Sequence, residues 1–451
     1  MYLFSIITQV VKNKVDIHQA ANNVIGKNKI ICPNNVLHVY RNGHYQVMED
    51  AEVNYKIYEL LDTCYTSSIG KEVVKIIGTK SYVDASRING ADYMLNLRNG
   101  MFDINALTLL PHDPKYYSTI QLDVNYLQDA ECPVWTKTLE GIFPDSPKRI
   151  SDLQEYFGYC LTREVKYEKA LLLLGEGANG KSTIIRVLQS ILGEDNYTSI
   201  TLDDLKSKHY QARLYGKLVN FGAESLSKGT ISDSILKLLV SGDTIEADEK
   251  YKGPFTFRPF CKLIFALNRL PRILDKSDGF FRKILIMRFE KQFSDEEQNK
   301  DLSNILLSEK DGIFMWAIEG LKRLRARGRF DIDSETKEEI SDYRQQNNSI
   351  LNFAENECFF HPQSMITMHD LHTAYKDWCG AEGFMAFGKN KFGRELTTLY
   401  PTISKGKDSS GNRIWVGLDL QSSQGMPVLE DVIIDNDHSD QLLEESILGN
   451  N

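Results

Sequence analysis

The residues best suited to chemistry in this sequence form one glycine-rich segment, residues 175–182. Its pattern, Gly-x-x-x-x-Gly-Lys-Ser, is that of a phosphate-binding loop, whose backbone N–H groups wrap the phosphates of a nucleotide. We expect Lys181 to contact the β- and γ-phosphates of ATP and the Ser182 hydroxyl to bind Mg²⁺. The predicted nucleotide contacts are Gly175, Glu176, Gly177, Ala178, Asn179, Gly180, Lys181, Ser182 and Thr183.

Two polar residues follow predicted strands downstream of this segment. Glu224 comes after the apolar run 217–222, and Asn268 directly follows the run 261–267. A triphosphatase needs a carboxylate at the end of a neighbouring strand, near Mg²⁺ and the attacking water, and Glu224 is our candidate. Many such enzymes carry two adjacent acids here, so whether Glu224 binds the metal, polarises the water or does both stays open. Asn268 could sense the γ-phosphate and orient the water.

A basic residue precedes the next apolar strand, predicted over 284–289. Residues 277–283 read Ser-Asp-Gly-Phe-Phe-Arg-Lys. An arginine fixed by buried aromatic residues could project across a subunit interface as an arginine finger, and Arg282 is our candidate. Lys283 and Arg272 are the competing basic residues.

These residues need an α/β scaffold to bring them together. A strand over 170–174 precedes the glycine segment and an amphipathic helix over 183–192 follows it, and strands alternate with helices to about residue 293. A hairpin is expected around Asn42-Gly43, and short strands over 93–126. The predicted domains are an α+β region (1–90), a mostly helical domain (91–165), the α/β motor (166–330), a linker helix with a final domain (331–425) and a disordered acidic tail (426–451).

Composition narrows the class of protein without naming its function. The net charge is −9, but seven acids and no Lys or Arg lie in 426–451, so the rest carries about −2 and leaves room for basic surfaces. The seven cysteines form no Cys-x-x-Cys pair. The first residues do not read as a signal peptide, and no apolar run could span a bilayer. We therefore expect a cytoplasmic protein that does not contact a membrane.

In this order, the motifs resemble those of superfamily 3 helicases, in particular the phage and poxvirus primase-helicase branch. The resemblance covers roughly residues 90–420 and includes the segments NLRNGMFDI, CPVWTKTLEGIF, ISDLQEYFGYCLT, LLLLGEGANGKST, GKLVNFGAE, KLIFALNRLPRI and SDGFFRKILI. It implies an AAA+-like motor that assembles as a ring, expected to be a hexamer. Each ATP would lie between subunits, with Arg282 supplied by the neighbour of the subunit that binds the phosphates.

The resemblance also assigns DNA contacts. Residues 241–253 are similar to the family's hairpin that lines the central channel, with Lys250 and Tyr251 at its tip and Lys252 beside them. Lys250 would neutralise a phosphate of single-stranded DNA and Tyr251 would stack on a base.

The end of the chain, residues 370–420, resembles the family's C-terminal winged helix. Its basic residues suit duplex DNA: Lys389, Lys391 and Arg394 on a helix, and Lys405, Lys407 and Arg413 on a two-stranded wing with Trp415 beneath. A protein-docking domain with incidental surface charge is the alternative. His369 and His372 lie three residues apart on a helix without a third metal ligand nearby, so we expect a structural role.

These features together favour an ATP-driven DNA helicase that recognises an origin and initiates replication of a phage-like mobile element in a bacterial host. The protein resembles initiators of phage-related islands, such as the staphylococcal pathogenicity islands. About 90 residues precede the helical domain, too few for a fused primase, so a separate primase is the expected partner. The alternative is a regulatory or remodelling AAA+ ATPase that binds DNA without unwinding it. The surrounding architecture and Arg282 argue against a small-molecule kinase.

Overall fold

We analysed the chain in a computed structural model, which describes residues 15–223, 233–249, 253–271, 278–299, 301–331, 334–421 and 433–434. The chain forms two compact units. The first comprises Met1–Lys228, Ser234–Leu270 and Arg282–Ile332; the second comprises Gly229–Asp233, Pro271–Phe281 and Asp333–Asn451. The boundaries predicted at residues 90 and 165 lie inside the first unit and stay predictions.

The N-terminal part of the first unit is a three-helix cluster beside a small sheet. Its elements are α1 (Ile17–Lys27), β1 (Ile30–Ile31), β2 (His38–Arg41), β3 (His44–Val47), α2 (Asp50–Leu61) and α3 (Ser67–Lys80), with the sheet in the order β1-β2-β3. The hairpin predicted at Asn42-Gly43 is confirmed. Both residues have positive φ, 50° and 91°, as a tight two-residue hairpin turn requires.

A second small sheet follows, with β4 (Met94–Leu97), β5 (Gly100–Asp103) and β6 (Thr108–Leu110) in that order. The predicted short strands are confirmed up to residue 110. They are wrong for 111–126, where the structure has a 3-10 turn at Pro114–Tyr116 and irregular backbone. This segment lies alongside β4 without forming a continuous ladder. Two separate hydrogen bonds connect them, from Leu122 N to Asn96 O (2.8 Å) and from Arg98 N to Val124 O (2.9 Å).

Four helices pack together: α4 (Pro133–Ile142), α5 (Pro147–Cys160), α10 (Leu302–Ser308) and α11 (Lys310–Arg327). Helices α4 and α5 confirm the helices predicted before β7, but residues 94–110 form strands β4 to β6, so the region 91–165 is not mostly helical. Helices α5 and α11 approach so closely that two glycines have no room for a side chain. A Cβ on Gly158 would lie 2.4 Å from Ala317 O, and one on Gly320 would lie 2.3 Å from Gln154 O. The buried carboxylate of Glu155 on α5 bonds to arginines of α11, which compensates its desolvation.

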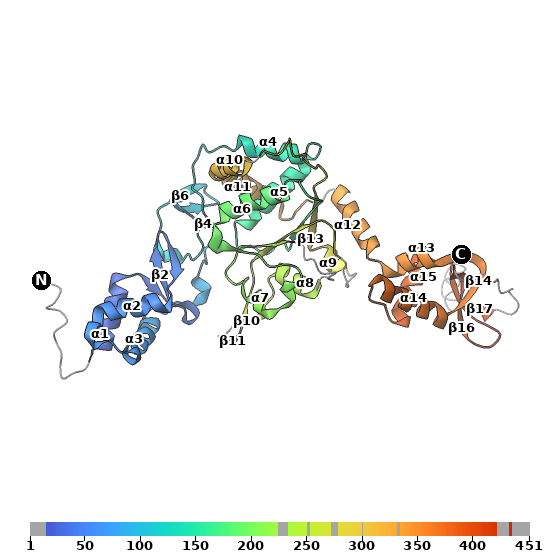
Figure 1. The fold of residues 1–451 in the computed structure, drawn as a ribbon, viewed down its shortest axis with the longest axis horizontal. Coiled ribbons are helices and arrows are strands. Elements are labelled where there is room, and N and C mark those ends of the chain that lie inside the picture. Colours follow the sequence, from blue (N-terminus) through green and yellow to red (C-terminus); the bar gives the residue numbers. More distant parts are fainter. Residues whose placement is uncertain are drawn as a thin grey trace, which may run out of the picture. The chain divides into compact units, whose positions relative to one another are not determined.

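A five-stranded parallel sheet forms the centre of the first unit. Its elements are β7 (Ala170–Leu174), α6 (Lys181–Leu192), β8 (Tyr197–Thr198), α7 (Lys208–Ala212), β9 (Val219–Ala223), α8 (Asp233–Ser241), β12 (Lys262–Leu267), α9 (Asp278–Phe281) and β13 (Ile284–Arg288). The order is β13-β7-β12-β9-β8, and every neighbouring pair is parallel. Helices α5, α6 and α11 gather on one side of this sheet, and α7 and α8 on the other (Figure 1). The predicted α/β core is confirmed.

The core of the sheet is continuous with the helices around it. Side chains of β7 such as Leu171 and Leu173 share one buried cluster with Trp135 of α4, Phe157 of α5 and Phe314 of α11. Helices α4, α5 and α11 therefore support the sheet directly.

The second unit contains α12 (Ser334–Gln346), α13 (Ser349–Glu357), β14 (Cys358–Thr367), α14 (Met368–Glu382), α15 (Lys389–Leu399), β15 (Ser404–Lys407), β16 (Arg413–Leu420) and β17 (Ile433–Ile434). The sheet is antiparallel in the order β14-β16-β15-β17. Phe353, Tyr375, Phe392 and Trp415 lie in its core. The linker helix, the two helices α14 and α15 and the two strands β15 and β16 lie where the sequence predicts them, whereas α13 and β14 were not predicted.

The acidic tail departs from expectation at one point. Ile433 and Ile434 pair with Lys407 and Gly406 of β15, so the prediction of disorder is wrong for these two residues. β-branched residues favour strands, and β15 would otherwise present an unpaired edge. The other tail residues lie outside the described ranges.

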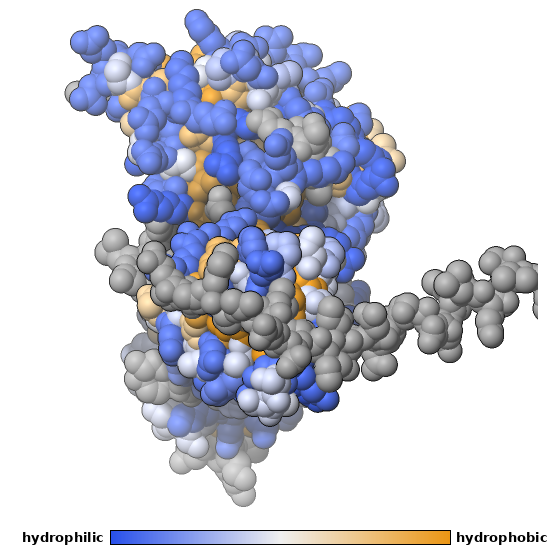
Figure 2. Space-filling model, turned by 90° about the vertical axis from the view of Figure 1, so that its right-hand side faces the viewer, coloured by the Kyte–Doolittle hydropathy of each residue, from blue (hydrophilic) through white to orange (hydrophobic). Residues whose placement is uncertain are grey.

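The surface is largely hydrophilic on the face drawn in Figure 2, where hydrophobic residues show mainly in recesses between polar ones. Among the helices that the structure describes, none combines the length and the apolar character needed to cross a membrane.

Candidate functional site

The glycine loop, residues 175–182, joins the carboxyl end of β7 to the start of α6. Ala178 and Gly180 have positive φ, 56° and 92°, which turns the backbone sharply just before the helix. A Cβ on Gly175 would lie 2.4 Å from Asn179 Nδ2 and 2.6 Å from Phe289 O, so this position has no room for a side chain. Gly177 has no atom within 4 Å of such a Cβ. The close approach at Gly175 therefore makes that glycine structurally necessary, whereas Gly177 has space.

Lys181 lies buried within this loop. Its Nζ donates to Gly175 O, to Glu176 O (3.1 Å) and to Asn179 Oδ1 (3.1 Å). Ser182 and Thr183 follow on the first turn of α6, where backbone N–H groups without helical partners favour an anion. The loop thus combines an ammonium, a helix N-terminus and a hydroxyl on the first helical turn, which are groups that fit a triphosphate and its Mg²⁺.

Asn268 lies beside the loop at the carboxyl edge of the sheet. Leu267 pairs with Leu174, and Gly175 N donates to Leu267 O at 3.1 Å, so the residues that follow both strands are neighbours. The next strand, β9, ends at Ala223, which pairs with Ala266. Glu224 comes directly after it in the sequence but lies outside the described residues. Parallel sheets bind ligands at this edge.

Of the two metal candidates, Ser182 lies at this edge on the first turn of α6, and Glu224 lies outside the described residues. Within the described part of the chain, no three His, Cys, Asp or Glu side chains gather to hold a metal ion. A metal here would therefore depend on oxygens of the nucleotide and water as well as on these two residues, as is usual for Mg²⁺.

Arg282 lies at the opposite, amino edge of the sheet, just before β13. Since Ile284 pairs with Ala170 at the start of β7, Arg282 and the glycine loop are separated by the length of that strand, roughly 20 Å for six residues. Arg282 is exposed and cannot reach the loop of its own chain. Its competitor Lys283 binds Glu168 Oε2 and Ser241 Oγ, each at 2.6 Å. Arg272 lies outside the described residues.

The predicted channel hairpin is confirmed as a hairpin. Strand β10 (Ile245–Glu249) pairs antiparallel with β11 (Gly253–Phe257). An aromatic cluster holds its base: the rings of Phe255 and Phe257 stack at 5.5 Å, and Tyr215 packs edge-on against both. Sequence patterns did not single out Tyr215. The predicted tip residues Lys250, Tyr251 and Lys252 lie outside the described ranges.

The predicted DNA-binding residues of the second unit are exposed on three consecutive elements, α15, β15 and β16. Lys389, Lys391 and Arg394 lie on α15, and Lys405, Lys407 and Arg413 lie on β15 and β16. Lys407 pairs with Arg413 at the end of the two strands.

The buried aromatic beneath these strands is Trp415, as expected from the sequence, and Lys405 Nζ lies 5.5 Å from its ring centre. His372 is buried and its Nε2 lies 2.8 Å from Phe387 O, whereas His369 contacts Lys389. The two histidines therefore make separate contacts within the domain.

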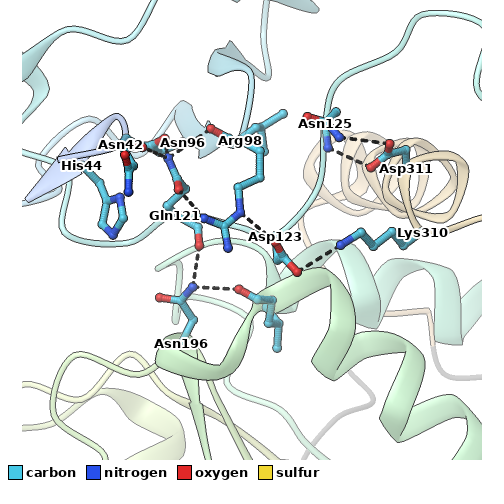
Figure 3. A network of polar contacts seen from close by, with 12 residues as sticks. Asn42, His44, Asn96, Arg98, Gln121, Asp123, Asn125, Asn196, Lys310 and Asp311 are labelled. Atoms are coloured by element: carbon cyan, nitrogen blue, oxygen red, sulfur yellow. Dashed lines mark hydrogen bonds and ion pairs between the residues drawn. The ribbon is translucent and has the colours of Figure 1, made fainter. Parts of the chain in front are cut away.

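A polar network supports the far end of α6 (Figure 3). The buried amide of Asn196 donates to Leu192 O, at the end of α6, and to Gln121 O, each at 2.7 Å. Gln121 in turn donates to Asn42 O of the N-terminal hairpin at 2.9 Å. Arg98 and Lys310 both bind Asp123, at 2.7 and 3.0 Å. The helix that begins with Lys181 is therefore fixed to the N-terminal hairpin and to α11.

Comparison with protein families gives three matches along the chain. The model described as "D5 N terminal like" matches residues 13–144, a family of unknown function, DUF5906, matches residues 173–283, and "Poxvirus D5 protein-like" matches residues 345–414. The middle match contains the glycine loop, Asn268 and Arg282, and the last contains α15 and β15. Each covers less than half of the chain.

The curated relatives come from large DNA viruses. A protein named "Putative helicase" from Acanthamoeba polyphaga mimivirus is 25% identical over 52% of this chain and 26% of its own length. Another of that name, from Invertebrate iridescent virus 6, is 24% identical over 54% of this chain and 28% of its own. A "Putative primase" of African swine fever virus is 24% identical over 49% and 24%. The chain thus spans about a quarter of the length of these relatives.

The fold has a counterpart among solved structures. The C-terminal region of NrS-1, in its A form apo structure, aligns over 90% of this chain and 100% of its own with a TM-score of 0.54 and 11% identity. A second apo structure of the same region gives 0.51. At this identity the likeness concerns the fold alone. The D5-type matches and the viral helicase and primase relatives together support a primase-helicase family of the phage and poxvirus type.

Proposed function

We propose that this chain is an ATP-dependent DNA helicase that initiates replication and unwinds DNA as a ring, with each ATP held between two subunits. One observation carries the proposal: Lys181 and Arg282 lie at opposite edges of one parallel sheet. A ring that sets the amino edge of one subunit against the carboxyl edge of the next would bring Arg282 to the neighbour's glycine loop. The similarity to viral proteins named as helicases supports the same function.

The nucleotide chemistry follows from the residues at the carboxyl edge. Lys181 would exchange its bonds to loop oxygens for bonds to the β- and γ-phosphates, and the loop N–H groups would hold those phosphates in place. Bound Mg²⁺ would neutralise phosphate charge, held in part by Ser182 and Glu224. Asn268 would orient the attacking water, and Arg282 of the next subunit would stabilise the charge that develops in the transition state.

The DNA contacts would come from two basic surfaces. Lys250, Tyr251 and Lys252, at the tip of the β10–β11 hairpin, would hold single-stranded DNA in the channel of a hexamer. Three helices, α13 to α15, with the β14–β16–β15 sheet support a winged helix in the second unit, whose α15 and β15–β16 would bind duplex origin DNA. We further propose a separate primase as partner and a phage-like mobile element in the bacterial cytoplasm as the setting.

A regulatory or remodelling ATPase without unwinding activity is the second candidate. The exposed basic residues of α15 and β15 are the observation behind this candidate, because a duplex-binding domain of this kind serves regulators as well as initiators. The two candidates differ in whether ATP hydrolysis separates strands.

A strand-displacement assay on a labelled forked duplex distinguishes the two candidate functions. The wild-type chain should release the labelled strand with ATP and not with a non-hydrolysable analogue, and single-stranded DNA should raise its ATPase rate. Lys181→Ala should abolish both activities, about 10³-fold or more, while duplex binding measured by fluorescence anisotropy persists. ATPase activity without strand displacement would favour the second candidate, and unchanged ATPase activity in Lys181→Ala would refute the nucleotide site.

A further inference from the structure

The backbone around Arg282 is held by the residues that lead into β7. Lys169 directly precedes this strand, and its Nζ donates to the main-chain oxygen of Arg282. The next residue along, Ala170, donates its N–H to Lys283 O at 2.8 Å. Two consecutive residues thus hold two consecutive carbonyls, one through a side chain and one through the backbone.

The neighbouring side chains fix the same segment from a second direction. Lys283 Nζ binds both Glu168 Oε2 and Ser241 Oγ, which ties the residue after Arg282 to the start of β7 and to the end of α8. Glu168 itself has a positive φ of 49°. A non-glycine residue keeps this sparsely populated conformation only where its surroundings impose it.

Lys169 differs from an ordinary surface lysine. Burial and the charge of nearby Lys283 lower the pKa of its ammonium to about 8, which means that its position disfavours the charge and that the bond to the Arg282 carbonyl offsets part of this cost. Lys166, three residues earlier, is exposed; its Nζ pairs with Glu164 at 3.2 Å and lies 5.0 Å from the centre of the Tyr167 ring, with no contact to the Arg282 backbone among the described residues. Lys169 is therefore held in a position that a lysine without this bond to the Arg282 carbonyl would not favour.

We propose that Lys169 is a positioning residue for Arg282: it holds the backbone from which Arg282 reaches the nucleotide of the neighbouring subunit. The inference rests on the proposed function, because it needs Arg282 to act in trans. Lys169 touches no nucleotide in this scheme. The length of strand β7 separates Lys169, which precedes the strand, from the glycine loop of the same subunit, which follows it.

The test compares Lys169→Met with Lys166→Met, the same substitution three residues away. Lys169→Met should lower the ATP hydrolysis rate of the assembled ring roughly 10- to 100-fold, the range expected when a catalytic group moves by about 1 Å. Its affinity for a fluorescent ATP analogue should not change, because its own glycine loop is intact. Lys166→Met should hydrolyse ATP at the wild-type rate. Lys169→Arg, which retains a donor for the carbonyl, should recover most of the activity.

Mixed rings then distinguish positioning in trans from general damage. Glu224→Ala subunits keep an intact Lys169 and Arg282, so mixing them with Lys169→Met subunits should restore hydrolysis at the shared interfaces. Lys169→Gln, checked by thermal melting, serves if the Met variant does not fold. Wild-type rates in Lys169→Met and Lys169→Gln, or a loss of activity that mixing cannot restore, would overturn the inference. Full activity in Arg282→Ala would instead overturn the trans finger of the proposed function, and the inference with it.

Discussion

The two edges of the central sheet hold their candidate chemistry in different ways. At the carboxyl edge, eight consecutive residues make the glycine loop, and Lys181 bonds to oxygens within that same loop. At the amino edge, Arg282 depends on Lys169, more than 100 residues earlier in the chain, and its neighbour Lys283 depends on Glu168 and Ser241. The glycine loop therefore carries its own geometry, whereas the backbone at Arg282 takes its geometry from residues distant in the sequence.

Arg282→Ala should have a larger effect than Gly175→Ala or Asn196→Ala, and it should affect hydrolysis without affecting nucleotide binding. Hydrolysis should fall about 10³-fold, since an arginine finger contributes that much or more to phosphoryl transfer, while nucleotide affinity stays at the wild-type value because the carboxyl edge is untouched. Steady-state ATPase rates and titration with a fluorescent nucleotide measure the two quantities. Mixing with Glu224→Ala should restore part of the rate, and no recovery in mixed rings would count against a finger acting in trans.

Substitution of single loop glycines should test which of them the glycine loop at the carboxyl edge requires. Gly175→Ala places a methyl group 2.6 Å from Phe289 O, so we expect nucleotide affinity to fall about 10-fold and the free energy of unfolding to fall by about 1–3 kcal/mol. Gly177→Ala is the matched control, because its methyl group meets no atom. Equal effects of the two substitutions, in calorimetric binding and chemical denaturation, would contradict this account of the loop.

Asn196→Ala should have the smallest effect on catalysis and a clear effect on stability. It removes the donors to Leu192 O and Gln121 O and leaves both carbonyls without that partner, which should lower the free energy of unfolding by about 1–3 kcal/mol. The ATPase rate of the folded protein should change less than twofold, roughly within the range of remote structural substitutions. Asn23→Ala, at an exposed position of α1, is the control. A large loss of ATPase rate would show that the network in Figure 3 affects the nucleotide site.

Elements with a regular pattern could be predicted from the sequence. Strand β7, helix α6 and the Asn42-Gly43 hairpin follow from short runs of residues whose spacing matches one structure. Helix α6 begins at Lys181, two residues before the expected start at Thr183, because the loop lysine and serine themselves form the first turn. Helix α14 ends at Glu382, where Gly383 caps it with a φ of 71°, a conformation that glycine adopts readily.

Irregular segments could not be predicted in the same way. Residues 111–126 contain apolar residues typical of strands, yet they form no ladder. The Gln121 side chain donates to Asn42 O of the hairpin and to Asn96 Oδ1 of β4, and the Gln121 carbonyl accepts from the Asn196 side chain. Ile433 and Ile434 lie within an acidic stretch whose composition predicts disorder, but the open edge of β15 offers them backbone partners.

The glycine loop, the order of strands and helices around it and the residues that follow each strand could be predicted from the sequence alone, because each depends on neighbours within a few positions. Three relations required the three-dimensional fold: Asn268 lies beside Gly175, Arg282 lies a strand's length away from them, and Lys169 bonds to the Arg282 carbonyl. Those relations depend on which strands pair and in which register. Pairing between β7, β12 and β13 is set by burial of the whole sheet, a property that no single segment of the sequence carries.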